Sequence, residues 1–432
     1  MKKKLRRTAI ILFWLGIWTV LALFVNNKIL MVTPTETAKE LLRLLRDGDF
    51  YVSVGRSLLR IGTGFLAGFA VAVLLAAGSR YFSFLEELMS PVMSLLKAIP
   101  VASFVVILLI WWGSSFLAVA ICFMVVLPNL YINMLEGLKN VDKKLLEMAR
   151  VFRMPFRNRF FYIYRPAFRP FLYSGMKISL GMCWKSGVAA EVIGTPDFSI
   201  GEQLYLSKIY LNTAGVFAWT AVIILLSVLF EKLVLKGMEL FFLWQPSCRR
   251  PEPEEKRHGK CESIILTNVD KSFGEQKVLN EVSATYEQGQ IYYLRQPSGS
   301  GKTTLLRILA GLEKPDGGNV TVPGAVSMMF QEDRLCEEYS AIKNVELVCG
   351  DRQKAEEALA CLLEKDAVEK PCETLSGGMK RRVALVRAME ADSAVVLLDE
   401  PFTGMDVQTR TRAESYIRAR QNNRTLIIAT HI

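Results

Sequence analysis

The sequence predicts an all-α transmembrane domain of six helices followed by a soluble α/β domain, and three observations lead to this prediction. Hydrophobic residues make up 51% of the 432 residues and charged residues 22%, which excludes disordered and collagen-like chains. Long charge-free runs stop near residue 246, after which charged residues and glycines become frequent. The segment at this break is rich in proline and charge, as extended linkers are. We therefore expect a membrane domain at 1–245, a linker at 246–260 and an α/β domain at 261–432.

Five apolar runs in the first region supply the six expected crossings. A helix needs about 20 apolar residues to cross a bilayer. The runs occupy residues 8–27, 61–79, 98–135, 170–193 and 209–230. The third run is long enough for two crossings, and Gly113, Ser114 and Ser115 form its natural turn. The fourth is the weakest, because it contains Lys185 and Glu191.

The net charge of +11 is concentrated in one loop. Nine basic and two acidic residues lie between Lys139 and Arg169, whereas the whole chain has 53 basic and 42 acidic residues. Positively charged loops stay in the cytoplasm, so we expect this loop and the basic N-terminus to lie there. The first run lacks a cleavage site and is expected to remain as an anchor. Six crossings then return the α/β domain to the cytoplasm. The sequence predicts a multi-pass protein of the cytoplasmic (plasma) membrane, in contact with membrane lipid, and no nucleic-acid partner.

Cysteine and histidine usage argues against a metal centre built from those side chains. The eight cysteines form no CxxC pair, and six of them follow residue 245. We expect them to be reduced and to pack in the cytosolic part of the chain. The chain has only two histidines, which excludes a histidine-rich metal site.

A phosphate-binding loop is the strongest local motif. The loop PSGSGKTT follows an apolar strand candidate at 291–294 and precedes a helix candidate at 305–310. Its candidate ligands are Ser298, Gly299, Ser300, Gly301, Lys302, Thr303 and Thr304. Glycines allow backbone N–H groups to close around phosphate oxygens at a helix N-terminus. Lys302 would reach the β- and γ-phosphates, and Thr303 would hold Mg²⁺. The alternative is a simple Gly-Ser turn. The usual pattern has glycine where this chain has Gln296, so we expect backbone strain there.

A second motif ends in two carboxylates. Residues 395–400, VVLLDE, have the pattern of a buried strand that ends at Asp399 and Glu400. An aspartate at the end of such a strand completes the Mg²⁺ shell of phosphoryl-transfer sites. The glutamate that follows would polarise the attacking water as a general base. The alternative is an apolar strand that simply ends in solvated acids.

Between these motifs lies LSGG, residues 375–378, followed by a helix-like segment at 380–389. In this order the three motifs resemble the ATP-binding cassette (ABC) ATPases. In that family the signature residues, here Ser376, Gly377 and Gly378, lie at a helix N-terminus and contact the γ-phosphate bound by the other subunit. A glycine-flanked helix N-terminus attracts anions, which agrees with this role.

The resemblance extends to four further residues. Phe273 in KSFG is similar to the aromatic residue that stacks on adenine, Gln331 in MMFQED to the glutamine that senses the γ-phosphate, Asp406 in TGMD to the aspartate that links the two sites, and His431 in ATHI to the switch histidine. The resemblance implies ATP and Mg²⁺ as ligands, with Glu400, His431 and Gln331 acting in catalysis. Thr303, Gln331 and Asp399 would then surround Mg²⁺. Taken singly, Phe273 also fits a core aromatic and His431 a surface histidine.

The membrane region resembles ABC importer permeases. Glu147, Met148 and Ala149, then Arg153, and later Arg165-Pro166-Ala167 are similar to the cytoplasmic EAA loop, although the family has glycine at the position of Arg153. In the family this loop forms a short helix that docks on the ATPase near the glutamine loop. The alternative is merely a basic cytoplasmic loop.

Four further segments resemble permeases of the nitrate, sulfonate and taurine class, with importers of riboflavin and thiamine precursors as relatives. They read TPTETAKELLRLLRDGDF, SLLRIGTGF, KAIPVASFVVILLIWWG and WKSGVAAEVIG. Lys185 and Glu191 both lie within the last segment, and a charge within a membrane helix is energetically costly. They either line the translocation path or have a structural role near the end of the helix.

The resemblance implies an importer half-transporter that acts as a homodimer and receives a small-molecule solute from an extracytoplasmic substrate-binding protein. One alternative is an ABC exporter or flippase. Another is a nucleotide-responsive membrane scaffold, in which Gln296 and the short sequence after His431 have impaired the ATPase.

Overall fold

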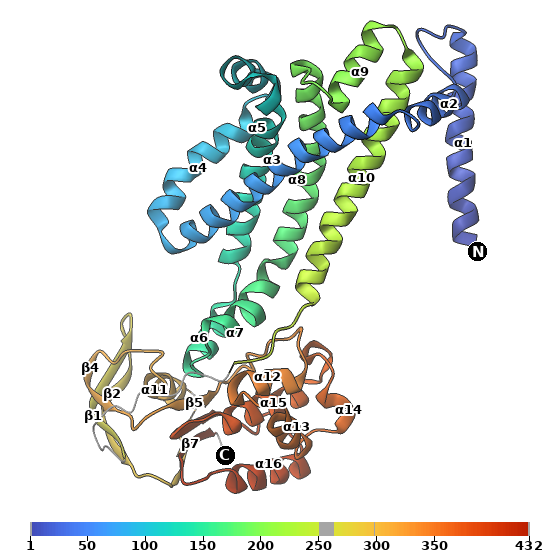
Figure 1. Ribbon diagram of the computed structural model, residues 1–432. Helices are drawn as coiled ribbons and strands as arrows, with labels where there is room; N and C mark the ends of the chain where they lie inside the picture. Colours follow the sequence, from blue (N-terminus) through green and yellow to red (C-terminus); the bar gives the residue numbers. More distant parts are fainter. Residues whose placement is uncertain (1, 250–262, 298, 431–432) are drawn as a thin grey trace. The chain divides into compact units, whose positions relative to one another are not determined.

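The computed structural model describes residues 2–249, 263–297 and 299–430, which form two compact units (Figure 1). The helical unit contains residues 1–140 and 168–244, and the α/β unit contains 141–167 and 245–432. The basic loop at 141–167 therefore belongs with the α/β unit by its contacts, although the chain around it is helical and apolar.

The helical unit consists of long helices joined by short connections. They are α1 (Lys2–Val25), α2 (Pro34–Leu44), α3 (Gly48–Tyr81), α4 (Ser83–Ala98), α5 (Val101–Lys139), α8 (Arg165–Gly194), α9 (Ile200–Ile209) and α10 (Thr213–Leu243). Four helical segments in the described residues are long and apolar enough to cross a membrane: 8–25, α3, α5 and α10. The count of six crossings stays a prediction. The predicted turn in the third run is present, because Gly113 has φ +72° and breaks α5 into two arms.

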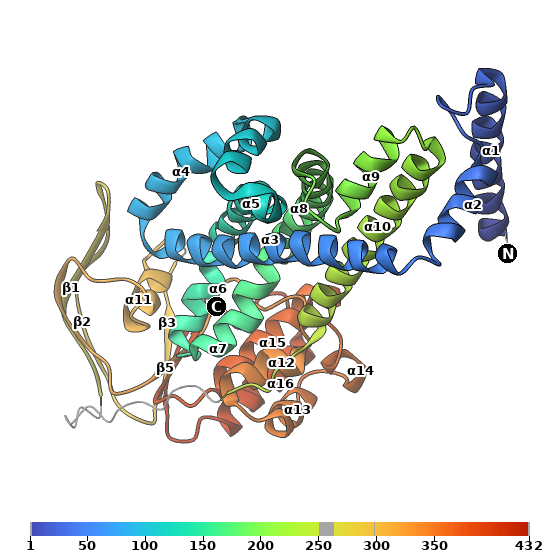
Figure 2. The same cartoon turned by 45° about the horizontal axis from the view of Figure 1, so that its top comes forward.

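Helices α3 and α5 pack closely along their length, and Figure 2 shows α3 running beside α5 through the unit. A Cβ added at Gly64 would lie 2.5 Å from the Val119 carbonyl oxygen and 2.6 Å from Cys122 Cβ. Small residues of this kind let the backbones of two membrane helices approach each other. The charge-free runs thus form a packed helical unit.

Glu191 is fully buried and connects three helices of the helical unit. Its Oε2 accepts hydrogen bonds from Ser57 Oγ at 2.6 Å and from the Gly201 N–H at 3.3 Å. Its Oε1 lies 3.7 Å from Arg60 Nη1. These contacts join α8 to α3 and to the start of α9, which favours the structural role over a place on the translocation path. Lys185, in contrast, is exposed in the single chain.

We therefore expect Glu191→Ala to lower the stability of the protein by about 3 kcal/mol, because breaking a buried ion pair leaves its partners unsatisfied. The melting temperature of the purified full chain in detergent measures this effect. Lys185→Ala is the matched control and should leave the melting temperature unchanged. An unchanged melting temperature in Glu191→Ala, together with lost transport, would instead place Glu191 on the path.

The α/β unit is built on two sheets. The antiparallel sheet has the order β2 (Gln276–Tyr286), β1 (Ile264–Phe273), β4 (Gly317–Thr321), and the parallel sheet the order β3 (Ile291–Arg295), β7 (Thr425–Thr430), β6 (Val395–Asp399), β5 (Val326–Met329). Strands β6 and β7 are buried at every position, as the strands of parallel sheets are. The strands predicted at 291–294 and 395–400 correspond to β3 and β6, and β6 ends at Asp399.

Helices surround this parallel sheet. They are α11 (Lys302–Leu309), α12 (Ala341–Cys349), α13 (Arg352–Ala360), α14 (Lys365–Val368), α15 (Gly377–Glu390) and α16 (Val407–Ala419). The predicted helices at 305–310 and 380–389 correspond to α11 and α15. Helix α11 begins at Lys302 within the phosphate-loop motif, and α15 begins at Gly377 within LSGG, so both motifs lie at helix N-termini.

The loop at 141–167 forms α6 (Lys143–Val151), α7 (Phe156–Arg159) and a π-helical turn at Phe160–Tyr164. Asp142 caps α6, because its Oδ1 accepts a hydrogen bond of 2.8 Å from the Lys144 N–H. Met148 and Ala149 are each 1% exposed and belong to the core cluster that also contains residues of β1, β5 and α11. The hydrophobic face of α6 is thus part of the core of the α/β unit.

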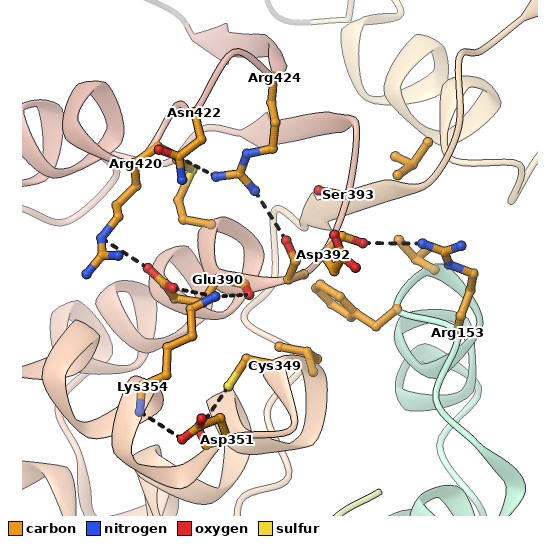
Figure 3. Close-up of a pocket in the computed structure, with 16 residues that line it drawn as sticks. Arg153, Cys349, Asp351, Lys354, Glu390, Asp392, Ser393, Arg420, Asn422 and Arg424 are labelled. Atoms are coloured by element: carbon orange, nitrogen blue, oxygen red, sulfur yellow. Dashed lines mark hydrogen bonds and ion pairs between the residues drawn. The ribbon is translucent and has the colours of Figure 1, made fainter. Parts of the chain in front are cut away.

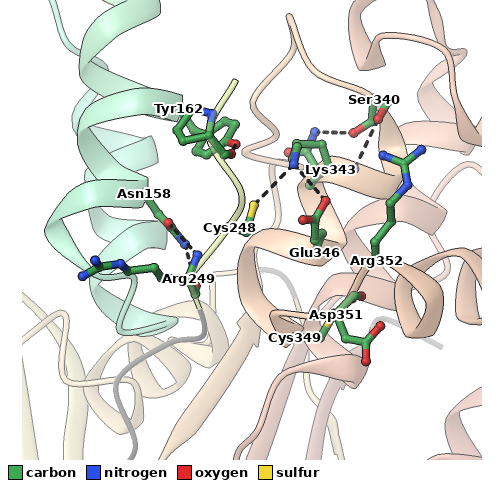
Figure 4. A network of polar contacts seen from close by, with 12 residues as sticks. Asn158, Tyr162, Cys248, Arg249, Ser340, Lys343, Glu346, Cys349, Asp351 and Arg352 are labelled. Atoms are coloured by element: carbon green, nitrogen blue, oxygen red, sulfur yellow. Dashed lines mark hydrogen bonds and ion pairs between the residues drawn. The ribbon is translucent and has the colours of Figure 1, made fainter. Parts of the chain in front are cut away.

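Residues 245–249 run along this loop (Figure 4). Asn158 donates to the Arg249 carbonyl at 2.8 Å and accepts from the Arg249 N–H at 3.1 Å. The Tyr162 hydroxyl donates to the Pro246 carbonyl at 2.5 Å, and Lys343 Nζ of α12 donates to Cys248 Sγ at 3.6 Å. The first residues of the expected linker are therefore packed, and its residues 250–260 lie outside the described residues.

Candidate functional site

The phosphate-loop candidate connects β3 to α11 through two glycines with left-handed backbones. Gly299 has φ +83° and Gly301 has φ +86°. A Cβ at Gly301 would lie 2.8 Å from Leu279 Cδ2 and 3.0 Å from the Val278 carbonyl. This position therefore needs glycine on grounds of both conformation and space. The N-terminus of α11 begins directly after the loop, where free backbone N–H groups favour an anion.

Lys302 and Ser300 both have polar atoms that face the loop. Lys302 is 8% exposed, and its Nζ donates to the main-chain carbonyls of Gln296 and, at 2.9 Å, of Pro297. Ser300 Oγ is buried and has no hydrogen-bond partner among the described residues. The φ of Gln296 lies outside the left-handed region. The expectation of strain at Gln296 is therefore wrong, because the loop makes its left-handed turns at Gly299 and Gly301.

The three candidate Mg²⁺ residues line one cavity of about 200 Å³. Thr303 Oγ1 donates to Asp399 Oδ2 at 2.9 Å, and Gln331 lines the same cavity. Asp399 is 1% exposed, and burial raises the pKa of its carboxyl group. Hydroxyl, carboxylate and amide oxygens are the ligands that Mg²⁺ prefers. The residues present therefore fit this ion, and Thr303, Asp399 and Gln331 are the candidates to hold it.

Glu400 stands at the end of β6 in an unusual conformation. Its φ is +49°, which is uncommon for a residue with a side chain and costs conformational energy. Its N–H donates to the Ala429 carbonyl at 2.9 Å, and its Oε2 accepts from Thr403 Oγ1 at 3.3 Å. Strand β6 ends at Asp399, and the left-handed backbone at Glu400 begins the turn that follows it.

The signature residues and Asp406 cap helices in the single chain. Ser376 Oγ accepts from the Met379 N–H at 3.3 Å at the start of α15. Asp406 Oδ1 accepts from the Thr409 N–H at 2.7 Å at the start of α16, and this hydrogen bond lowers the pKa of Asp406. None of these residues lines the cavity of Thr303, Gln331 and Asp399 in the described part of the chain. Gly377 and Gly378 begin α15 beside Ser376.

The other predicted site residues have separate positions. Phe273 ends β1 and is 50% exposed, so it is not a core aromatic. Lys271 Nζ lies 5.3 Å from the centre of its ring. Thr304 is half-buried in α11, next to Thr303. Ser298 and His431 lie outside the described residues.

The sequence of this chain matches two families over separate regions. Residues 279–403 match the family described as "ABC transporter", and residues 64–234 match the family described as "Binding-protein-dependent transport system inner membrane component". Curated relatives of this chain include three import ATP-binding proteins. The chain is 40% identical over 167 residues to the aliphatic sulfonates import ATP-binding protein SsuB 3 of Rhodococcus jostii, in a match that covers 38% of this chain and 62% of that protein.

A second relative is the aliphatic sulfonates import ATP-binding protein SsuB 1 of the same organism, which is 38% identical over 180 residues that cover 39% of this chain and 72% of the relative. The chain belongs to the ABC transporter family. A third relative, the Fe(3+) ions import ATP-binding protein FbpC of Agrobacterium fabrum, is 37% identical over 191 residues, which cover 39% of this ABC transporter chain and 54% of the relative. The chain spans less than two thirds of the length of the first of these relatives.

This ABC transporter chain carries both a permease region and a cassette region, and Glu147 of α6 links the loop between the membrane helices to the nucleotide-site candidate. Its carboxylate accepts from Arg307 Nη1 at 3.1 Å and Nη2 at 3.0 Å, and from Arg334 Nη1 at 2.7 Å. The hydrogen bond from Arg307, assisted by Arg334, lowers the pKa of Glu147 to about 2. Arg307 belongs to α11, and Arg334 follows Gln331. A single carboxylate thus holds the helix after the phosphate loop and the segment around Gln331.

Arg153 has φ +50° at the position where the EAA loop resemblance expects glycine. Its Nη2 donates to the Asp392 carbonyl at 3.3 Å (Figure 3). The left-handed backbone explains the glycine of the family pattern, and the contact with Asp392 helps to hold an arginine in this conformation.

Sequence reasoning missed three arginines near the site: Arg307, Arg334 and Arg381. Arg381 is 5% exposed in α15, and it shares a helix face with the buried residues Ala384, Leu385 and Ala388. A charged residue on an apolar helix face is a signal that the sequence does contain. Arg307 and Arg334 leave no comparable signal, because their common partner is Glu147, more than 150 residues away in sequence.

A larger cavity of about 840 Å³ lies elsewhere in the α/β unit (Figure 3). Its charged residues largely pair with each other, since Glu390 lies 3.2 Å from Lys354 Nζ and 3.4 Å from Arg420 Nε. It contains none of the predicted site residues. Volume alone therefore does not locate the nucleotide site in this protein.

Proposed function

We propose that this chain is half of an ATP-driven importer, in which two copies form a homodimer in the cytoplasmic membrane. The observation that carries the proposal is the position of Glu147, which joins the loop between membrane helices to both Arg307 and Arg334 beside the nucleotide-site candidate. A movement of the segment around Gln331 must then displace α6. We also propose the domain limits 1–245 and 261–432, with α6 and α7 acting as the coupling segment.

The chemistry assigned to the site is hydrolysis of ATP. Lys302 exchanges the carbonyls of Gln296 and Pro297 for phosphate oxygens of ATP, and Ser300 and the N–H groups of the loop bind the same phosphates. When bound by Thr303, Asp399 and Gln331, Mg²⁺ neutralises phosphate charge. Glu400 accepts a proton from the attacking water while the water oxygen bonds to the γ-phosphorus and the bond to ADP breaks. Phe273 stacks on the adenine through its exposed ring.

Two chains are needed because one chain leaves the site incomplete. Ser376, Gly377 and Gly378 lie at a helix N-terminus suited to an anion, yet they do not line the cavity of Thr303 and Asp399. In the proposed homodimer they contact the γ-phosphate held by the partner, and Asp406 and His431 act at the same interface. Closure of the two cassettes on ATP moves both coupling segments, and hydrolysis resets them.

Import is favoured over export because the membrane region matches permeases that depend on binding proteins. We propose that an extracytoplasmic substrate-binding protein delivers the solute. We propose a sulfonate, nitrate, taurine or vitamin-precursor type of solute, supported by the permease segments and by two relatives whose names are those of aliphatic sulfonate import proteins. The FbpC relative acts on a different class, which is why the substrate needs a direct test.

The cognate binding protein is the place for that test. A thermal-shift screen with alkyl sulfonates, nitrate, taurine and pyrimidine-like precursors should raise its melting temperature with one of these classes, because a ligand stabilises the fold that binds it. Ferric citrate is the matched negative control. A shift with Fe³⁺ alone, or with none of the small anions and heterocycles, would contradict the proposed substrate class.

Transport direction is measured in proteoliposomes that contain the full chain. With ATP on the cassette side and binding protein on the other, solute should move toward the cassette side. Movement toward the binding-protein side would support the exporter alternative. ATP binding without transport or hydrolysis would support the membrane scaffold.

A further inference from the structure

Arg381 divides its two terminal nitrogens between two loops of the α/β unit. Nη1 donates to the carbonyls of Phe330 at 2.7 Å and Gln331 at 2.9 Å. Nη2 donates to the carbonyls of Asp399 at 2.5 Å and Glu400 at 2.7 Å. One guanidinium therefore binds the main chain of the segment around Gln331 through one nitrogen and the main chain at the end of β6 through the other.

Because the guanidinium is planar, its hydrogen bonds fix the distance between the two loops. Its nitrogens are held at a fixed separation and angle, so the four carbonyls are held in a fixed relation to one another. The Arg381 side chain is buried, and its Nε has no partner among the described residues. The two terminal nitrogens thus contact four carbonyls, and Nη1 also lies 3.3 Å from Asp333 Oδ1. The side chain can therefore leave one loop only if a buried charge loses its partners.

Glu400 is the residue that most needs such support. Its φ of +49° is a conformation that persists only when its surroundings determine it. The hydrogen bond from Arg381 to the Glu400 carbonyl and the hydrogen bond from the Glu400 N–H to Ala429 hold its peptide groups on both sides. Loss of the first would let the backbone relax and move the carboxylate.

Arg381 also belongs to the helix that starts at the signature. Helix α15 begins at Gly377, and Arg381 follows Ser376 by five residues, or roughly 7.5 Å along a rigid helix. Two turns later Arg387 donates to the carbonyls of Arg334 at 2.7 Å and Asp333 at 2.9 Å. Helix α15 thus holds the segment around Gln331 at two points, while Ser376, Gly377 and Gly378 do not line the cavity of this chain.

We propose that Arg381 is a positioning residue that sets the backbones of Gln331 and Glu400 as one unit and connects both to the signature end of α15. This inference rests on the proposed function, in which that end binds the ATP of the partner. Displacement of α15 by the partner's nucleotide then moves Gln331 and Glu400 of its own chain together. The consequence is that occupancy of one ATP site adjusts the catalytic geometry of the other.

The test uses the full-length protein in detergent with the variants Arg381→Lys and Arg381→Gln. Arg381→Lys keeps the charge and donates hydrogen bonds, but an ammonium lacks the fork that spans both loops. We expect kcat for ATP hydrolysis by Arg381→Lys to fall by about 100-fold, because small misplacements of reacting groups have effects of that size. The affinity for Mg-ATP should change by less than about threefold, and the Hill coefficient for ATP should fall toward one.

Arg424→Gln is the matched control. Arg424 is half-buried, and like Arg381 it binds main-chain carbonyls, those of Ala391 at 3.2 Å and Gln421 at 3.1 Å. It lies on the larger cavity (Figure 3). This variant should lose melting temperature and retain kcat and the Hill coefficient. Arg381→Lys with wild-type kcat would overturn the proposal, as would a loss of kcat that Arg424→Gln shares at the same melting temperature. Should Arg381→Gln fail to fold, Arg381→Lys decides alone.

The failure of this inference is distinguishable from failure of the proposed function. If wild type and Glu400→Gln hydrolyse ATP at equal rates in the same assay, the proposed function is wrong. If Glu400→Gln is slow and Arg381→Lys is as fast as wild type, only the role of Arg381 is wrong.

Discussion

Glu400→Gln is expected to lower kcat for ATP hydrolysis by a factor of about 10² to 10⁴, the usual contribution of a general base. Glutamine has nearly the same shape as glutamate and keeps an oxygen acceptor for Thr403, but it cannot take a proton from water. Binding of Mg-ATP should persist, because Lys302, Thr303 and Asp399 are unchanged. Steady-state hydrolysis and equilibrium binding of labelled ATP to the purified chain measure the two effects.

Lys302→Ala is the companion variant, and its main effect should be on the binding of ATP. It removes the ammonium that donates to the Gln296 and Pro297 carbonyls of the loop, and with it the proposed electrostatic contact to the phosphates. We expect a loss of ATP affinity. Equal ATPase rates in wild type and both variants would contradict the assignment of Glu400 and Lys302.

Glu147→Ala is expected to uncouple transport from hydrolysis. Removal of the carboxylate leaves Arg307 and Arg334 without their shared partner, and the two like charges then repel each other. Met148 and Ala149 remain buried, so α6 should stay folded but lose its link to α11 and the segment around Gln331. Transport per ATP should fall at least about tenfold, while ATP affinity stays within about threefold. Solute uptake and phosphate release measured in the same proteoliposomes provide the ratio.

Lys144→Ala is the control on the same helix. Lys144 Nζ lies 2.7 Å from Glu332, but both side chains are more than half exposed, and such surface pairs contribute little. Its transport per ATP should equal that of wild type. An equal loss in both variants would mean that any change on α6 disturbs coupling, and that Glu147 has no special role.

Glu147 also predicts how coupling depends on pH. Its pKa is lowered from an unfolded value of 4.5 to about 2, so its ion pairs contribute fully above pH 4.5 and are lost as the pH falls through about 2. Transport per ATP should therefore be constant between pH 5.5 and 8. A decline within that window that Glu147→Gln removes would contradict this pKa assignment.

The local elements of the cassette could be predicted from sequence because their signals are local. Strand β3, the phosphate loop and α11 follow one another directly in the sequence. In the permease region the kink at Gly113 could be predicted for the same reason, because it lies in an apolar run that is too long for one crossing. The meeting of Thr303 and Asp399 was expected from the phosphate loop and the strand that ends in two carboxylates, whereas Gln331 was added only through the family resemblance. No local pattern brings these three residues together.

The features that could not be predicted from the sequence depend on contacts between segments that are distant in the chain. Nothing near Glu147 indicates that Arg307 and Arg334 will bind it, and nothing in the apolar face of α15 reveals that Arg381 binds four carbonyls on two loops. The strain expected at Gln296 was wrong because a motif states which residue is common at a position and does not state which φ this loop uses. The number of crossings is still a prediction, because the charges of Lys185 and Glu191 lower the mean hydropathy of α8.

The most direct test of the account is nucleotide trapping by mixed pairs of two defective chains, each carrying Glu400→Gln and its own affinity tag. One chain also carries Lys302→Ala, and the other carries Ser376→Asp, which keeps a good N-cap on α15 but repels a phosphate. If ATP lies between two copies, a pair purified through both tags contains one intact composite site and should trap one Mg-ATP, whereas either chain paired with itself should trap none. Trapping by the Ser376→Asp chain paired with itself, or none by the mixed pair, would contradict the account.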